Sequence, residues 1–269
     1  MCRWIAYTGP QIPMSLALIE AKHSLLVQSE RSTMGAEPMN GDGFGVGWYS
    51  PHMDTPGVYR DVRPAWNDEN FRDVTAHIRS RMFLAHIRAT TGTAVQRSNC
   101  HPFRHGRWLF QHNGLVPEFH LLRRDLLFEI GQNFFDSIQG TTDSEVLFHM
   151  ALTYGLETDP PAALSRTINT VESHMDRHGI DGELQFSAAV ADGETIYAVR
   201  YANHGTPRTL FYATDLDVLK ELDPHLEAIP EGSIVVVSEP LGPARVTNWP
   251  RPMFRSTSES AFTSTASVW

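Results

Sequence analysis

The sequence predicts an α+β protein in which antiparallel sheets stack on one another. Strand-like segments dominate up to about residue 111, helical segments follow, and strand-like segments return after residue 185. A doubly wound parallel sheet would instead alternate strands and helices along the whole chain. The segments 185–191 and 194–201 flank Asp192-Gly193, a typical signal of a tight hairpin between antiparallel strands.

The first part of the chain is expected to form four strands and one helix. From Phe44 onward, glycine alternates with bulky residues, as in a strand that another backbone approaches closely. The spacing of Phe71, Val74 and Ile78 is helical. The expected elements are a helix over 67–81 and strands at 3–8, 44–49, 82–89 and 107–111. The first strand is expected to end at a Gly9-Pro10 turn.

The second part is expected to form three helices and then a second set of strands. Two helices are predicted between 121 and 156, the second beginning at Thr142-Asp143, and a third over 161–178. No convincing linker divides the chain, so we expect a single domain over 2–250 and a disordered Ser/Thr-rich tail over 251–269. After the hairpin, further short strands are expected at 209–213, 233–238 and 244–247.

The composition argues against a nucleic-acid or membrane partner. The 269 residues include 22 basic and 31 acidic side chains, for a formal net charge of −9, and no basic run. No apolar stretch is long enough to span a bilayer, and no signal peptide is visible. Cys2 and Cys100 could form one disulfide, but without a sign of secretion we expect reduced thiols, a cytoplasmic protein and a small-molecule substrate.

Neither a metal nor another cofactor is expected. His101, His105 and His112 are spaced like possible ligands, but no acidic ligand lies between them, and Pro102 disfavours a helix there. The glycines of 41–47 lack the spacing of a dinucleotide or phosphate-binding loop, so phosphate binding is rejected.

Cys2 is the most informative single residue. Trimming of Met1 would leave it with both a thiol and a free α-amine. These groups titrate at about 8.5 and about 7.7–8.0 in model compounds, so one residue could hold a nucleophile and its base. The alternative is a small side chain on the first strand. A Cys2–His86 or Cys2–His112 pair is also possible, although no protease signature surrounds Cys2.

Three further segments carry candidate site residues, each with a plain structural alternative. The planar guanidinium group of Arg88 could bind a carboxylate through two hydrogen bonds, or it could form a solvent-facing salt bridge. Asn113-Gly114 could donate to an oxyanion, or simply form a turn. Asp143 could receive an ammonium group, but Thr142-Asp143 is also a typical helix N-terminus.

Together these segments resemble the class II glutamine amidotransferases. The likeness runs from residue 2 to about residue 240 and is closest to short stand-alone members, including the γ-glutamyl amidohydrolase of ergothioneine biosynthesis. It implies a four-layer αββα sandwich of two antiparallel sheets, the N-terminal-nucleophile hydrolase fold. The motifs that carry it are Cys2, Asn40-Gly-Asp-Gly-Phe-Gly45, His86-Ile-Arg88-Ala-Thr-Thr-Gly92, His112-Asn113-Gly114 and Thr142-Asp143-Ser144.

The resemblance also implies a role for each site residue. Cys2 would attack the γ-carboxamide carbon of the substrate, and Asn113 and Gly114 would hold the oxyanion. Arg88 would bind the α-carboxylate and Asp143 the α-ammonium group. The product would be a γ-glutamyl thioester, later hydrolysed to glutamate. Thr90, Thr91 and Gly92 would shape the loop beneath the substrate.

Three functions remain open at this stage. The first is a stand-alone amidohydrolase that cleaves glutamine or another γ-glutamyl compound. The second is a glutaminase subunit that passes ammonia to a separate synthase subunit, because larger family members deliver ammonia to a second domain through a channel. The third is a non-catalytic glutamine sensor, which would need neither the nucleophile nor the oxyanion donors.

Overall fold

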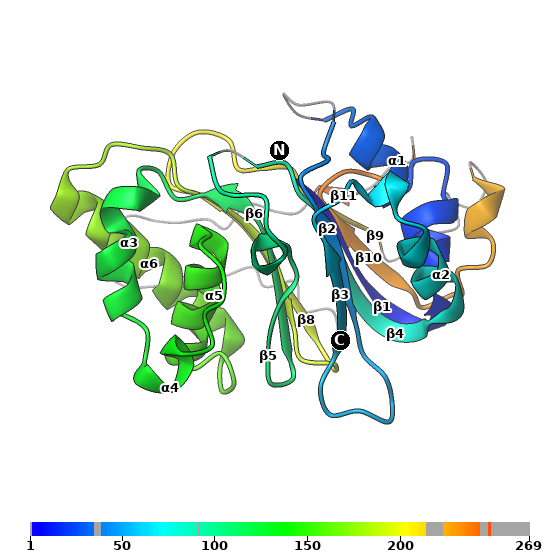
Figure 1. The fold of residues 1–269 in the computed structure, drawn as a ribbon, viewed down its shortest axis with the longest axis horizontal. Coiled ribbons are helices and arrows are strands. Elements are labelled where there is room, and N and C mark those ends of the chain that lie inside the picture. The colour runs from blue at the N-terminus through cyan, green and yellow to red at the C-terminus, as the bar shows by residue number, and fades with distance from the viewer. Residues whose placement is uncertain (1, 35–38, 91, 214–222, 243–246, 249–269) are drawn as a thin grey trace.

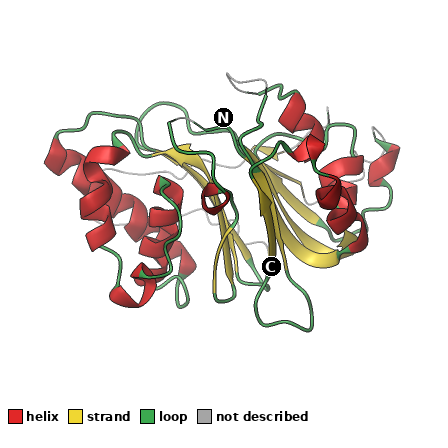
Figure 2. Ribbon diagram, in the orientation of Figure 1, coloured by secondary structure: helices red, strands yellow, loops and turns green. Residues whose placement is uncertain are grey.

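Two antiparallel sheets lie face to face between two layers of helices (Figures 1 and 2). This computed structural model describes residues 2–34, 39–90, 92–213, 223–242 and 247–248. Every strand pairing in these segments is antiparallel. The expected α+β class and the four-layer αββα arrangement are therefore confirmed.

The larger sheet has seven strands in the order β11-β9-β10-β1-β4-β2-β3. The first strand of the chain, β1, lies at its centre between β10 and β4. Cys2 directly precedes this strand, so it lies at one end of the central strands, where β4 and β10 also end. The strands are β1 (Arg3–Pro13), β2 (Phe44–Trp48), β3 (Gly57–Asp61), β4 (Arg79–Ile87), β9 (Phe211–Ala213), β10 (Ile234–Val237) and β11 (Thr247–Asn248).

The smaller sheet has four strands in the order β5-β6-β7-β8, and helices α3 to α6 cover its outer face (Figure 1). The predicted hairpin is confirmed, with β7 and β8 paired along their whole length. The strands are β5 (Phe103–His105), β6 (Trp108–Leu115), β7 (Gln185–Ala191) and β8 (Ile196–Ala202), and the helices are α3 (Phe119–Phe128), α4 (Gln132–Phe135), α5 (Asp143–Thr153) and α6 (Pro160–His178).

Shorter helices cover the outer face of the larger sheet (Figure 2). Their buried apolar side chains, such as Leu25, Leu26 and Phe71, pack against β1, β2 and β4. None of the described helices is both long and apolar enough to cross a membrane. The helices are α1 (Leu25–Glu30), α2 (Glu69–His77), a π-helical turn (Leu16–Glu20) and 3-10 turns at Ala65–Asn67, Arg97–Asn99 and Pro224–Leu226.

The core layer between the two sheets combines alanines with larger apolar residues. Four alanines, Ala6, Ala189, Ala191 and Ala198, belong to this buried cluster. Because alanine is short, the two sheets can approach each other closely, and residues from both can form one site. The larger members of the layer include Trp4, Met82, Leu84 and Leu109.

The predicted Gly9-Pro10 turn is wrong, because β1 continues to Pro13. The pairing of β1 with β4 shifts register between Thr8 and Ile12, so the irregular residues form a bulge within the strand. A Cβ on Gly9 would lie 2.8 Å from the Ser233 Cα. The close approach of the Ser233 backbone therefore explains why glycine occupies this position.

The predicted helix over 67–81 is too long at both ends, because α2 spans only Glu69–His77 and β4 already begins at Arg79. Arg79 and Ser80 pair with Pro13 and Ile12 of β1, and this long-range pairing replaces the last helical turn. The expected tail at 251–269 and most of the expected strand at 244–247 lie outside the described residues.

Candidate active site

The predicted site residues come from three layers of the fold. Cys2 precedes β1 and Arg88 follows β4, both in the larger sheet, whereas Asn113 and Gly114 lie near the end of β6 in the smaller sheet. Asp143 is the first residue of α5. The Asn113 side-chain amide donates to the Cys2 carbonyl oxygen at 3.1 Å, so the two sheets meet at the cysteine.

The Cys2 thiol is partly buried and lies against the backbone of Ala89. The Ala89 N–H donates to the Cys2 Sγ at 3.4 Å, and the Sγ lies 3.5 Å from the Ala89 carbonyl oxygen. Burial raises the pKa of the Cys2 thiol, and the Ala89 hydrogen bond only partly opposes this effect. The thiol is therefore protonated at neutral pH and needs a base before it can act as a nucleophile.

Arg3 holds the Cys2 backbone from the other side. Its Nη1 donates to the Cys2 carbonyl oxygen at 2.9 Å, so this oxygen accepts from both Arg3 and Asn113. The Arg3 Nε forms an ion pair with Glu239 Oε2 at 2.5 Å, and both side chains are fully buried. The position of the cysteine is thus fixed by a buried charged network that the sequence analysis did not identify.

Glu239 is the centre of that network. Its carboxylate accepts from the Thr33 N–H at 2.8 Å and from the Thr33 hydroxyl at 2.7 Å. It also contacts the ring of His23 at 2.7 Å and the Ser32 hydroxyl at 2.8 Å. These hydrogen bonds outweigh burial and hold the pKa of Glu239 well below its usual range. The one sequence signal for Glu239 is the presence of a charged residue shortly after the apolar run 234–237.

Arg88 is buried without an anionic partner. Only 4% of its surface is exposed, and no carboxylate in the described segments forms an ion pair with it. Its guanidinium donates instead to neutral oxygens, the Thr90 hydroxyl at 3.1 Å, the Thr93 hydroxyl at 2.5 Å and the Ala94 carbonyl at 3.1 Å. The solvent-facing salt bridge is therefore wrong for this residue.

The loop after β4 is held against a second loop by Asp42. The Thr90 N–H donates to Asp42 Oδ2 at 2.8 Å, and the Asp42 N–H donates to the Arg88 carbonyl at 3.0 Å. The loop then bends through Gly92, whereas Thr91 lies outside the described residues. The sequence analysis cited this Asp42 only as part of a glycine-rich motif and gave it no role.

Asn113 and Gly114 belong to β6, so the interpretation of Asn-Gly as a turn is wrong. Gly114 pairs with Phe186 of β7. A Cβ at Gly114 would lie 2.0 Å from the Gln185 carbonyl oxygen and 2.1 Å from His112 Nε2. Glycine is required here by close packing within the sheet, rather than by turn geometry.

Three histidine rings lie behind this strand. His86 Nε2 donates to the His112 carbonyl oxygen at 3.2 Å, and His112 Nδ1 is hydrogen-bonded to the Ser144 hydroxyl at 2.8 Å. The His86 ring packs against that of His101, with 4.2 Å between centroids and 32° between the ring planes. Burial lowers the pKa of His86 to about 3. Within the described part of the chain, neither His86 nor His112 is hydrogen-bonded to Cys2.

Asp143 is already engaged at the start of α5. Its Oδ2 accepts from the Val116 N–H at 3.0 Å, and its Oδ1 accepts from the Ser144 N–H at 2.7 Å. Thr142 caps the helix by accepting from the Glu145 N–H at 3.2 Å, which confirms the predicted N-terminus. A carboxylate has about four acceptor positions, so Asp143 can still accept from a ligand.

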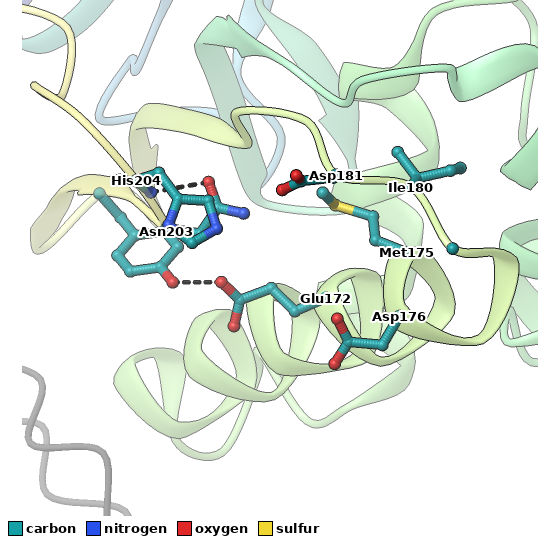
Figure 3. A pocket seen from close by; sticks show the side chains of 9 residues that line it. Glu172, Met175, Asp176, Ile180, Asp181, Asn203 and His204 are labelled. Atoms are coloured by element: carbon teal, nitrogen blue, oxygen red, sulfur yellow. Dashed lines mark hydrogen bonds between the residues drawn. The ribbon is translucent and has the colours of Figure 1, made fainter.

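Both cysteines are free. Two cavities differ in how their lining residues relate to the candidate site. One of about 530 Å³ lies between α6 and β8 and includes Glu172, which Tyr201 hydrogen-bonds, and none of the candidate site residues (Figure 3). The other, about 640 Å³, includes Leu115, the neighbour of Gly114. No cluster of three or more potential metal ligands occurs within the segments that the structure describes.

The four-layer sandwich of two antiparallel sheets is the fold of the N-terminal-nucleophile glutamine amidotransferases. The chain belongs to the class II glutamine amidotransferases, because the family model described as glutamine amidotransferases class-II matches residues 19–241. The family resemblance seen in the sequence is therefore confirmed.

Individual relatives agree with this assignment. The chain is 34% identical to the probable glutamine amidotransferase DUG3 of Saccharomyces cerevisiae, over 77% of this chain and 65% of the yeast protein, so just under two thirds of that relative is matched. It is 30% identical to the gamma-glutamyl-hercynylcysteine sulfoxide hydrolase of Mycolicibacterium smegmatis, over 89% of this chain and 96% of that protein. The solved structure of a glutamine aminotransferase class-II domain protein from Silicibacter pomeroyi is 34% identical, with a TM-score of 0.68, and covers 93% and 92% of the two chains.

Proposed function

We propose that this enzyme cleaves the γ-amide of glutamine or of another γ-glutamyl compound through a thioester on Cys2. The observation that carries the proposal is the contact between the two sheets, in which the Asn113 amide donates to the Cys2 carbonyl oxygen at 3.1 Å. Its support for the proposal is that the amide, a hydrogen-bond donor, is held against the backbone of the residue that carries the thiol. The names of the relatives support the same class of chemistry, because they include a γ-glutamyl hydrolase and a probable glutamine amidotransferase.

The first half of the reaction forms the thioester. Once Met1 is removed, the α-amine of Cys2 accepts the thiol proton, directly or through a water molecule, and overcomes the raised thiol pKa. The sulfur then attacks the γ-carboxamide carbon. The second hydrogen of the Asn113 amide and the Gly114 N–H stabilise the oxyanion. Collapse of the intermediate returns the proton to the leaving nitrogen and releases ammonia or an amine.

The second half hydrolyses the thioester. The α-amine accepts a proton from water, the hydroxide attacks the acyl carbon, and the same donors stabilise the second oxyanion. The C–S bond then breaks, glutamate leaves, and the thiol regains its proton. The enzyme ends the cycle unchanged.

The amino-acid end of the substrate is proposed to bind between Arg88 and Asp143. The Arg88 guanidinium is buried among neutral acceptors, so a carboxylate would compensate its charge better than hydroxyl and carbonyl groups do. Asp143 has an acceptor position left for the α-ammonium group. The loop containing Thr90, Thr91 and Gly92 would form the floor of this subsite.

Labelling and substitution at Cys2 test the proposal. The protein with Met1 removed, verified by intact mass, should hydrolyse at least one member of a panel of γ-glutamyl amides. Cys2→Ala should abolish turnover and leave the fold intact. The glutamine analogue 6-diazo-5-oxo-norleucine should label Cys2 only, and Cys100→Ala, which removes the buried second thiol, should still be labelled. Labelling at Cys100, or turnover by Cys2→Ala, would contradict the proposal.

Retention of Met1 provides a second test, because a blocked α-amine cannot act as the base. A chain carrying one extra residue before Cys2 should fold normally and have no measurable amidohydrolase activity. Binding of glutamine to processed protein without any turnover across the panel would favour the sensor function instead. Strong activity that appears only with a second protein and its substrate would favour the ammonia-supplying subunit.

A further inference from the structure

The cavity of about 640 Å³ lies next to the proposed oxyanion donors. Leu115 directly follows Gly114, and Gln185 pairs with Leu115 at the adjoining end of β7. Met34 also lines the cavity, and its N–H donates to Glu239 at 3.3 Å, in the network that holds Arg3 and Cys2. Two separate segments of the chain therefore link the lining of the cavity to the residues around Cys2.

This cavity is distinct from the subsite proposed for the amino-acid end of the substrate. Its lining includes neither Arg88 nor Asp143, nor the described residues of the loop beneath them. A γ-glutamyl amide extends in two directions from its reacting carbon, toward the glutamyl α-carbon and toward the leaving nitrogen. With the glutamyl end at Arg88, the cavity is available to whatever the leaving nitrogen carries.

Arg208 supplies a cation to the cavity that no described group neutralises. Its Nε is buried without a hydrogen-bond partner, and no ion pair or hydrogen bond of its guanidinium occurs in the described segments. Burial lowers the pKa of Arg208, while the nearby carboxylate of Glu183 acts in the opposite direction. Arg208 is half-buried, and its Nε is shielded from water without a hydrogen bond, which is unfavourable and which a bound anion would offset.

The backbone of Arg208 is fixed even though its guanidinium has no described partner. Its N–H donates to the Gln185 side-chain oxygen at 3.0 Å, and its carbonyl accepts from Arg200 Nε at 2.8 Å. Gln185 Nε2 in turn donates to the Glu183 carboxylate and to the Thr206 carbonyl. The one carboxylate in the cavity lining is therefore bound to Gln185 and does not pair with Arg208. Such an anchored but unpaired arginine is suited to binding a ligand.

We propose that this cavity receives the leaving group of a γ-glutamyl amide and that Arg208 binds a carboxylate on that group. The inference rests on the proposed function, because the γ-glutamyl bond must lie over Cys2. Ammonia would leave almost all of the 640 Å³ empty, whereas pockets of about 300–1,000 Å³ are typical of sites for small organic ligands. The favoured substrates are γ-glutamyl amides of amino acids or peptides, rather than glutamine itself.

Two substrates of nearly equal size test the proposal. γ-Glutamylglycine has a carboxylate on its leaving group, and γ-glutamylglycinamide has a neutral amide at the same place. The processed enzyme should prefer the acid by about 10- to 100-fold in kcat/KM, as expected for a charged hydrogen-bonded contact. Arg208→Gln should reduce this ratio to about 1, and Arg208→Lys should give an intermediate ratio because it keeps the charge and loses the fork.

The control variant is Arg104→Gln, which removes an exposed arginine outside the cavity and should keep the wild-type ratio. Thermal unfolding of each variant shows whether the fold is retained. An unchanged ratio in folded Arg208→Gln, or a wild-type enzyme with no preference for the acid, would overturn the inference while leaving the proposed function intact.

A binding experiment separates this inference from the proposed catalysis. Titration calorimetry on Cys2→Ala should show tighter binding of γ-glutamylglycine than of γ-glutamylglycinamide. The difference should disappear in the Cys2→Ala, Arg208→Gln double variant. Equal binding of both compounds by Cys2→Ala would refute the role of Arg208 whatever the turnover assays give. If no substrate is turned over and Cys2 is not labelled, but the two compounds still differ in affinity, only the proposed hydrolysis is refuted.

Discussion

At the level of the single residue we propose two roles for Asn113, and its amide group has a hydrogen for each. One N–H donates to the Cys2 carbonyl oxygen, and the second is available for the oxyanion. Asn113→Ala should therefore lower kcat by about 100- to 1,000-fold, the usual effect of removing one oxyanion donor. Steady-state kinetics on the best γ-glutamyl substrate measures this. Asn133→Ala, at an exposed position of α4, is the control, and a loss of less than tenfold at Asn113 would contradict the role.

His101 makes the stability of the protein depend on pH. Burial, together with the charges of His86, His112, Arg88 and Arg60, lowers the pKa of His101 well below 6.5. As the pH falls below about 6.5, the unfolded chain takes up a proton that the folded protein does not, so stability decreases by about 1.4 kcal/mol per pH unit from this group. His101→Phe keeps a ring between His86 and Phe103 and should remove this contribution.

Urea unfolding at pH 6 and pH 5 measures the His101 effect. Wild type should lose about 1.4 kcal/mol more than His101→Phe over that interval. The same exchange at exposed His120 controls for the added hydrophobic surface and should leave the wild-type pH dependence unchanged. Equal slopes for wild type and His101→Phe would show that the ring is protonated in the folded state.

Glu239 joins three elements through one carboxylate. It pairs with Arg3 at the start of β1, lies just beyond β10, and accepts hydrogen bonds from Thr33 in the loop after α1. Glu239→Gln should destabilise the fold by about 3–5 kcal/mol, because Arg3 would remain buried without its counter-ion. Since the pKa of Glu239 is lowered, this stabilisation is present above its ordinary pKa and is lost only as the pH falls through the folded value.

Denaturation at pH 7 measures the loss at Glu239. The matched control is Glu227→Gln, at an exposed position outside the network, which should change stability by less than about 0.5 kcal/mol. A similar small effect at Glu239 would mean that the network contributes little. Because Arg3 also holds the Cys2 carbonyl, folded Glu239→Gln should have a lower kcat as well.

The elements predicted correctly are those that residues close together in the sequence specify. The capped N-terminus of α5, the helix over 160–178 and the Asp192-Gly193 hairpin each depend on residues a few positions apart. The bulge in β1 and the strand position of Asn113-Gly114 depend instead on distant backbones, so their local turn chemistry was misleading. Arg3 and Glu239 are 236 positions apart, and no local pattern links them.

At the scale of the whole molecule, the site depends on how far apart the two sheets lie. The hydrogen bonds that cross between the sheets include those from Gln111 to the Ile5 carbonyl, from His86 to the His112 carbonyl and from Asn113 to the Cys2 carbonyl. Each is between 3.0 and 3.2 Å long, so a small separation of the sheets would break them. We therefore expect the alanines between the sheets to matter for catalysis as well as for packing.

Ala189→Leu tests this dependence, because Ala189 is fully buried in the layer between the sheets. Overpacking should cost about 1–3 kcal/mol and force the sheets apart, which would move Asn113 away from Cys2. Leu164→Ala, in the outer core under α6, should cost about 2–5 kcal/mol without changing that distance. At a temperature where both variants are more than nine-tenths folded, kcat should fall at least tenfold in Ala189→Leu and less than twofold in Leu164→Ala. Equal activities in the two variants would show that the spacing of the sheets does not control the site.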